Sequence, residues 1–373
     1  MNSSVDGRLA RLRGSLPVDE PGARGFERVA RNPDCTRLRA LTIVGIDSAT
    51  AAVQVYGEPA REGQSPFAIA IGNRFDRAMA ENGAAELLEL YRTAGRLTTE
   101  ECKVVIVPDM VPIGSRRDLK HVMAVRQTIT QKLLEQKLRR DPKAPNIIVK
   151  PRVLVTLLGL DHGIEPDVLV ASDSDAFYRP VEIKSYPDRA GKTESADIRS
   201  ASRQAAVGVV ALRNIACRMG VRDVAALVPA LGDLVLRIPG ALKPTLRPMT
   251  LKGEVDSLER AIQEAPSNLE ELEEMLPAGS ALDDPLVLES IPNSYRSSCR
   301  EYCALAQHCK QAAVANGDPV VLGDVARETL AAAGSISRAL DLARGTGAPP
   351  RTPAEQALAE QLREAMNEYR EAV

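Results

Sequence analysis

The fold of this chain is decided by residues 164–204, which read IEPDVLVASDSDAFYRPVEIKSYPDRAGKTESADIRSASRQ. The two apolar runs IEPDVLV and YRPVEIK are expected to pair as a β-hairpin. Successive side chains of a strand point to opposite faces, so Glu182 and Lys184 share one face and their apolar neighbours take the other. The pairing would bring Asp167 beside them on the polar face.

A helix expected over Ala196–Met219 follows the hairpin and carries Gln204. Two carboxylates and one ammonium group would then converge on one point. Carboxylates are ligands that Mg²⁺ and Mn²⁺ accept, and Lys184 beside such an ion can orient or deprotonate a water. The alternative interpretation is a solvated hairpin face with a surface ion pair.

This arrangement resembles the PD-(D/E)xK nuclease superfamily, with PD ending at Asp167 and E-x-K running from Glu182 to Lys184. The resemblance implies an α/β, restriction-endonuclease-like fold, a mixed sheet flanked by helices. It implies that Asp167 and Glu182 bind the metal, that Lys184 activates or orients the attacking water, and that Gln204 positions the water or the strand. RecB-like members have Gln-x-x-x-Tyr on this helix, whereas Gly208 replaces the Tyr here.

A second element of the resemblance lies upstream, in a helix expected over Phe67–Arg92. RecB-like nucleases have a Gly, three residues and then a metal-binding His. This chain has GNRFD, which ends at Asp76. An Asp also binds Mg²⁺ or Mn²⁺, so the resemblance implies a metal role for Asp76. The alternative is an acidic residue favoured near a helix N-terminus by the helix dipole.

Three of the six cysteines lie within the segment SYRSSCREYCALAQHCK, at Cys299, Cys303 and Cys309. Together with Cys35 they provide four thiolates, the ligand set of a [4Fe–4S] cluster or a Cys₄ zinc site. In the zinc alternative, His308 can replace Cys35 as a ligand.

The cysteine pattern resembles that of AddB-type iron–sulfur nucleases, in which one Cys precedes the nuclease core and three follow it. The resemblance implies a structural [4Fe–4S] cluster that clips the two ends of the core together. Three residues separate the first two cysteines of this triplet, where the family has two. Cys102 and Cys217 lie in apolar surroundings and are expected to be buried thiols.

The expected domains are a flexible N-terminal lead-in (1–30), a nuclease domain (31–310) and a helical C-terminal extension (311–373). The lead-in is rich in Arg, Gly and Pro and lacks periodicity. In the extension, TPAE at 352–355 predicts a capped helix start.

Charge is distributed unevenly along the 373 residues. The net charge is −2, yet residues 254–289 contain eleven acidic side chains and one arginine, so the remainder is basic. A basic body is compatible with binding phosphates, for which Arg199 and Arg203 on the predicted helix are candidates. Because Trp is absent and aromatic residues make up 3%, base-stacking platforms are not expected.

The chain shows no signal-peptide pattern and no apolar run of membrane-spanning length, so a cytoplasmic location is expected. The resemblance implies a Mg²⁺- or Mn²⁺-dependent DNA nuclease, acting on single strands or free ends, in DNA repair or anti-phage defence of the CRISPR-adaptation kind. No Walker A motif is present, so a helicase, ATPase or defence-complex partner would be a separate protein. The alternatives are a non-catalytic DNA-binding scaffold that keeps the fold, and an RNA nuclease.

Overall fold

The computed structural model describes residues 5–19, 21–59, 66–99, 101–112, 118–157, 160–189, 191–264 and 266–372. The chain divides into two compact units. Unit 1 comprises Met1–Asp47 and Glu62–Leu282, and unit 2 comprises Ser48–Arg61 and Asp283–Val373. The second unit therefore begins earlier than the extension expected from residue 311, and it includes a segment from the N-terminal part of the chain.

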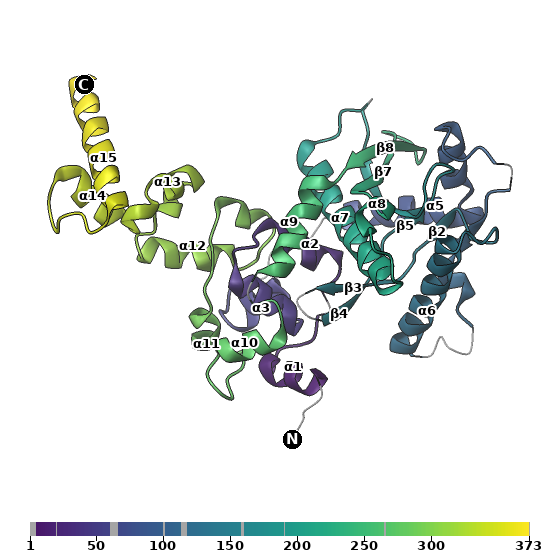
Figure 1. Cartoon of the computed structure of the whole chain (residues 1–373), viewed down its shortest axis with the longest axis horizontal. Coiled ribbons are helices and arrows are strands. Elements are labelled where there is room, and N and C mark those ends of the chain that lie inside the picture. The colour runs from purple at the N-terminus through teal and green to yellow at the C-terminus, as the bar shows by residue number, and fades with distance from the viewer. Residues whose placement is uncertain are drawn as a thin grey trace. The chain divides into compact units, whose positions relative to one another are not determined.

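Unit 1 contains a six-stranded mixed sheet in the order β1-β2-β5-β6-β7-β8. The strands are β1 (Val104–Ile106), β2 (Ile147–Val149), β5 (Val168–Val170), β6 (Arg179–Pro187), β7 (Leu231–Arg237) and β8 (Pro244–Thr250). The pairs β1–β2 and β6–β7 are parallel and the others antiparallel. A long helix connects each parallel pair, α6 (Leu119–Leu138) and α7 (Ser195–Arg218), because parallel neighbours need a crossover (Figure 1). The expected α/β class is confirmed.

The predicted hairpin is also present. β5 pairs antiparallel with β6, and Val168 lies opposite Val181. The sequence of the run 146–160 is rich in Ile and Val and predicts one strand at the sheet centre, whereas the structure divides it. Only β2 joins the sheet, while β3 (Val153–Leu157) pairs with β4 (Leu160–Ile164) in a separate two-stranded sheet. The division falls at Lys150, whose φ is +50°, and at Pro151, which cannot donate a ladder hydrogen bond.

One face of the six-stranded sheet is covered by α5 (Pro66–Thr93). Apolar side chains of α5 and of alternate strand positions form a single buried cluster, which includes Phe75, Met79, Leu87, Tyr91, Val168, Val181, Ile183 and Val235. The sequence predicts a break in this helix at Gly83, and the backbone is indeed not helical at Glu81–Ala84. Since Val181 and Ile183 face α5, Glu182 and Lys184 face the other way, as predicted.

The opposite face is covered by α7, which approaches the sheet at two glycines. A methyl group added to Gly208 of α7 would lie 2.8 Å from Cβ of Pro180 in β6. One added to Gly232 of β7 would lie 3.6 Å from Cβ of Ala205. The close contact leaves no room for a large side chain at position 208, because it would push α7 away from β6. The same approach places Gln204, one turn earlier, near the sheet.

The N-terminal region is helical where we expected a flexible lead-in. It forms α1 (Val5–Arg13), α2 (Ala23–Arg31) and α3 (Thr36–Val44). Phe26, Val29 and Ala30 are buried at spacings of three and four, the pattern of an amphipathic helix that our reading of the composition missed. The remaining helices of the unit are α8 (Val224–Leu227), α9 (Lys252–Gln263) and α10 (Leu269–Met275), with a 3₁₀ turn η1 at Val107–Met110. Arg8 of α1 binds Glu270 and Glu273 in the acidic segment.

Within its described residues, unit 2 contains helices and no strand. These are α4 (Ser48–Gln54), α11 (Pro285–Ser290), η3 (Ser297–Glu301), α12 (Ala306–Ala315), η4 (Pro319–Leu322), α13 (Asp324–Thr329), η5 (Ala331–Ala333), α14 (Ile336–Arg344) and α15 (Pro353–Ala372). The predicted cap of α15 is confirmed, since Glu355 N donates to Thr352 Oγ1 at 3.1 Å. None of the helices in the described ranges has both the length and the apolar character needed to span a bilayer.

Candidate active site

Asp167 occupies the position directly before β5 and is anchored through both carboxylate oxygens. Its Oδ2 accepts a hydrogen bond from the backbone N–H of Ile183 at 2.9 Å. Its Oδ1 accepts one from Nζ of Lys150 at 2.8 Å. The first contact ties Asp167 to β6 at the residue between Glu182 and Lys184. The sequence prediction that Asp167 lies beside the E-x-K segment is therefore confirmed.

Lys184 connects the sheet to α7. Its Nζ donates to Oε1 of Glu182 and to Oε1 of Gln204, both at 2.8 Å. Burial alone would lower the pKa of Lys184, but the carboxylates of Glu182 and Asp167 outweigh burial and raise it. Lys184 is therefore an ammonium ion at neutral pH. The residues that we predicted to be catalytic, Asp167, Glu182, Lys184 and Gln204, lie together.

The negative charge of Glu182 is unfavourable because its carboxylate is buried. Burial is the main cause that raises its pKa to about 7, and the negative charge of Asp167 is the second. Lys184 and Lys150 act in the opposite direction without cancelling the effect. Two carboxylates in such proximity favour a bound cation, because added positive charge relieves both the repulsion and the cost of burial.

Asp76 joins the same group through Lys150, which donates to Oδ1 of Asp76 and Oδ1 of Asp167, each at 2.8 Å. Asp76 is the eleventh residue of α5, whose first residue is Pro66. The helix-dipole alternative therefore fails, because that effect is limited to the first turn. The side chain of Asp76 is 39% exposed, against 12% for Glu182, so Asp76 is the solvent-side member of the group.

The three carboxylates Asp76, Asp167 and Glu182 are chemically suited to a hard divalent cation. In the part of the chain that the structure describes, no group of three or more His, Cys, Asp or Glu side chains is arranged to hold a metal ion as it stands. The carboxylates are instead linked by the two ammonium groups, Lys150 between Asp76 and Asp167 and Lys184 against Glu182.

Two further residues belong to this group and were not predicted from the sequence, Lys150 and Glu27. Glu27 of α2 is buried and accepts hydrogen bonds from Nε2 of Gln204 at 3.3 Å and Oγ of Ser200 at 3.4 Å. The amide of Gln204 is thus held between Glu27 and Lys184, which fixes its orientation. No pattern around Glu27 points to this role. For Lys150 a signal existed, a lysine at the end of the buried strand IIV and directly before a proline.

The predicted phosphate-binding arginines lie on α7. Arg199 is exposed and Arg203 is half-buried. Burial, followed by the like charge of Arg31 on α2, lowers the pKa of Arg203. Positive charge therefore gathers along α2 and α7, on the helices that hold Glu27 and Gln204.

The cysteine triplet lies in unit 2, where Cys299, Cys303 and Cys309 are all buried in or beside η3 and α12. The Sγ of Cys299 accepts a hydrogen bond from the backbone N–H of Arg296 at 3.4 Å and lies 3.4 Å from the hydroxyl of Tyr302. Burial, then contact with Cys299, raises the pKa of Tyr302, which keeps its hydroxyl protonated and able to donate to sulfur.

The remaining residues of the predicted cysteine chemistry are Cys35, His308, Cys217 and Cys102. Cys35 is buried in unit 1, immediately before α3. His308, the alternative zinc ligand, stacks on Tyr56 in unit 2 with ring centroids 3.8 Å apart. The prediction that Cys217 is buried is wrong, because it lies exposed near the C-terminal end of α7, and Cys102 is only half-buried. Next to Cys217, Ile215 and Ala216 are buried while the thiol is exposed, whereas Cys102 packs partly against the buried cluster beside α5.

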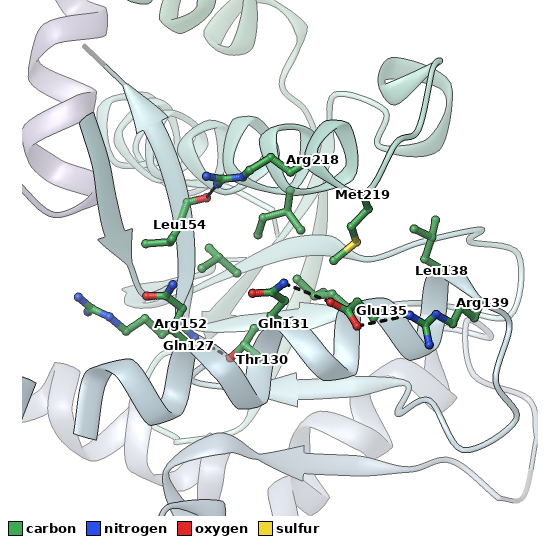
Figure 2. Close-up of a pocket in the computed structure, with 13 residues that line it drawn as sticks. Gln127, Thr130, Gln131, Glu135, Leu138, Arg139, Arg152, Leu154, Arg218 and Met219 are labelled. Carbon is green, nitrogen blue, oxygen red and sulfur yellow. Dashed lines mark hydrogen bonds and ion pairs between the residues drawn. The ribbon is translucent and has the colours of Figure 1, made fainter. Parts of the chain in front are cut away.

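A cavity of about 410 Å³ lies elsewhere in unit 1, between α6, β3 and α7 (Figure 2). Several polar side chains that line it are bound to one another or to nearby backbone. Glu135 accepts from Gln131 at 3.1 Å and pairs with Arg139, while Arg218 donates to the carbonyl of Leu154 at 3.3 Å. None of the catalytic, metal-binding, cluster-binding or phosphate-binding residues predicted from the sequence lines this cavity. It therefore offers no group of converging reactive side chains comparable to the carboxylate site.

No protein-family model and no curated protein matches this sequence. The chemistry of the site must accordingly be inferred from its own residues.

Proposed function

We propose that this chain is a metal-dependent nuclease of the PD-(D/E)xK superfamily, of the RecB-like kind, that hydrolyses DNA phosphodiester bonds. The observation that carries the proposal is the convergence of Asp167, Glu182, Lys184 and Gln204. Lys184 donates to Glu182 and to Gln204 at 2.8 Å, and Asp167 accepts from the backbone N–H between Glu182 and Lys184 at 2.9 Å. Asp167 directly precedes β5, Glu182 and Lys184 lie in β6 and Gln204 lies in α7, so the four follow the order of the family motif. In this proposal the mixed sheet is a restriction-endonuclease-like core.

Asp76, Asp167 and Glu182 would hold Mg²⁺ or Mn²⁺, which supplies positive charge to the phosphate and the leaving oxygen. Lys184 has a raised pKa and is protonated, so its role is to orient the attacking water and stabilise negative charge. Gln204, held by Glu27, positions the water or the strand. Arg199 and Arg203 would contact backbone phosphates, which carry no sequence information, so cleavage would have little sequence preference.

The proposal includes the biological setting that the resemblance implies. The protein would act in the cytoplasm on single-stranded DNA or free ends, in repair or anti-phage defence, beside a separate helicase, ATPase or defence-complex subunit. Cys35, Cys299, Cys303 and Cys309 would hold a structural [4Fe–4S] cluster that clips the nuclease core. Support for this part is the burial of all four thiols and the hydrogen bonds to Cys299, which suit a thiolate ligand.

The nuclease proposal is tested with labelled single-stranded DNA, double-stranded DNA and RNA of one sequence, with Mg²⁺, Mn²⁺ or EDTA. We expect DNA cleavage that EDTA abolishes and that Glu182→Gln and Lys184→Met each reduce by a factor of about 10² or more. Glu259→Gln, a matched change at a partly exposed ion pair on α9, should leave the rate unchanged. Undiminished cleavage by Glu182→Gln would contradict the assignment, and a preference for RNA would change the substrate class.

The cluster is tested by purifying the protein without oxygen and measuring its visible spectrum with its iron, sulfide and zinc content. We expect a coloured protein that contains iron and sulfide, and loss of both in Cys303→Ser. Cys217→Ser, which alters an exposed thiol, is the matched control and should stay coloured. A colourless protein with about one zinc per chain would replace the cluster by a structural zinc site.

A further inference from the structure

Lys150 is held in an unusual backbone conformation at the end of β2. Its φ of +50° lies in the left-handed region, which costs free energy for a residue other than glycine. Both of its backbone polar groups are fixed. The N–H donates to the carbonyl of Asp167 at 2.9 Å, and the carbonyl accepts from Nη2 of Arg126 at 2.8 Å. A strained conformation that is held from both sides serves to direct the side chain.

That side chain points into the group of carboxylates. Its Nζ lies 2.8 Å from Oδ1 of Asp76 and 2.8 Å from Oδ1 of Asp167, and the side chain is 27% exposed. It bridges Asp76 of α5 and Asp167 beside β5. An ammonium group and a divalent cation cannot both lie between these two oxygens, because like charges at such a separation repel strongly.

We propose that Lys150 is a displaceable counter-cation. Its ammonium group holds Asp76 and Asp167 together and competes with the divalent cation for the Oδ1 atoms of these two residues. This inference rests on the proposed function, since it assigns Asp76 and Asp167 to the metal. Lys150 thereby sets the affinity of the site for metal. Lys184 has a different role, because its partners are Glu182 and Gln204 and it leaves the oxygens between Asp76 and Asp167 untouched.

The test is a titration of the full-length protein with Mn²⁺, followed by calorimetry and by the electron paramagnetic resonance signal of the free ion. We expect Lys150→Met to bind Mn²⁺ at least about tenfold more tightly than the wild type, because the competing charge is gone. Lys103→Met is the matched control, since Lys103 donates to the carbonyl of Pro142 away from the site, and its affinity should not change.

The outcomes separate the two proposals. Binding of Mn²⁺ with equal or lower affinity in Lys150→Met overturns the role of Lys150 and leaves the nuclease proposal intact. If neither the wild type nor Lys150→Met binds Mn²⁺, the metal site itself is wrong, and the nuclease proposal fails with it.

A second measurement uses the wild type and does not depend on the folding of a variant. Lysines are acetylated briefly with and without Mn²⁺, and the modified positions are quantified by mass spectrometry. We expect Lys150 to react faster when Mn²⁺ is present, because its ammonium group has left the two carboxylates, while Lys103 reacts at the same rate. Equal protection of Lys150 under both conditions would show that it is a permanent ion pair.

Discussion

Two groups of charged side chains in the same sheet illustrate the difference between a structural ion pair and a reactive site. Asp233 of β7 has no exposed surface, and its carboxylate accepts from the hydroxyl of Tyr91 at 2.9 Å and from Nη1 of Arg96 at 2.7 and 2.8 Å. The negative charge of Asp233 is paired with the positive charge of Arg96, and solvent does not reach the Asp233 carboxylate.

The active-site group contains the same residue types in a different balance. Three carboxylates, Asp76, Asp167 and Glu182, face two ammonium groups, Lys150 and Lys184, and a fourth carboxylate, Glu27, is bound to Gln204. Negative charge is in excess, and the side chains of the first three carboxylates are 12–39% exposed. What distinguishes the site is therefore surplus charge that a ligand can reach, and the residue types alone do not reveal it.

The largest expected difference between the two groups is in the free energy of unfolding, when one aspartate of each group is replaced by asparagine. Asp233→Asn should lower the free energy of unfolding by about 3 kcal/mol or more, because it leaves Arg96 without its buried partner. Asp167→Asn should cost less than about 1 kcal/mol, since the loss of a contact with Lys150 is offset by relief of repulsion with Glu182. Urea denaturation in EDTA measures both. Similar losses in the two variants would remove the distinction.

A smaller change in stability is expected when the pH is varied. The pKa of Glu182 in the folded protein is raised to about 7, above its ordinary value, so the folded state binds its proton more tightly than the unfolded chain does. The associated stability is present in full at pH below the ordinary value and is lost as pH rises through about 7. Glu182→Gln has no such proton, so its stability relative to the wild type should increase between about pH 5 and pH 8. Melting temperatures in EDTA across that range provide the measurement, and parallel curves for the two proteins would contradict the shift.

The parts of the fold that the sequence predicts are those governed by local periodicity. The period of two in β6 separates Glu182 and Lys184 from Val181 and Ile183, and the pairing of β5 with β6 then places Asp167. Most of the candidate site follows from one hairpin and the next helix. The long helices α5 and α7 and the cap of α15 were also predictable, because α5 and α7 each bury one apolar side and Thr352 caps α15.

The parts that failed depend on contacts between distant segments. Glu27 and Lys150 reach the site only because α2 packs on α7 and because β2 ends in a left-handed residue beside Asp167. No short pattern points to Glu27, and the lysine–proline pair after the strand IIV marks Lys150 without showing which side chains it reaches. The run 146–160 looked like one strand, since hydropathy does not register the turn at Lys150 and Pro151. Burial of Cys217 was predicted from its neighbours, whereas a helix can turn one residue outward among buried ones.

The division of the chain into two units has a consequence for its synthesis on the ribosome. Ser48–Arg61 belongs to unit 2, where Ser48 Oγ accepts from the backbone N–H of Ala304 at 3.3 Å and Tyr56 stacks on His308. At typical elongation rates of about 5–20 residues per second, this segment leaves the ribosome roughly 10–50 s before its partners. Unit 2 therefore cannot fold until the residues that follow Asp283 have been made, and the early segment stays without its partners until then.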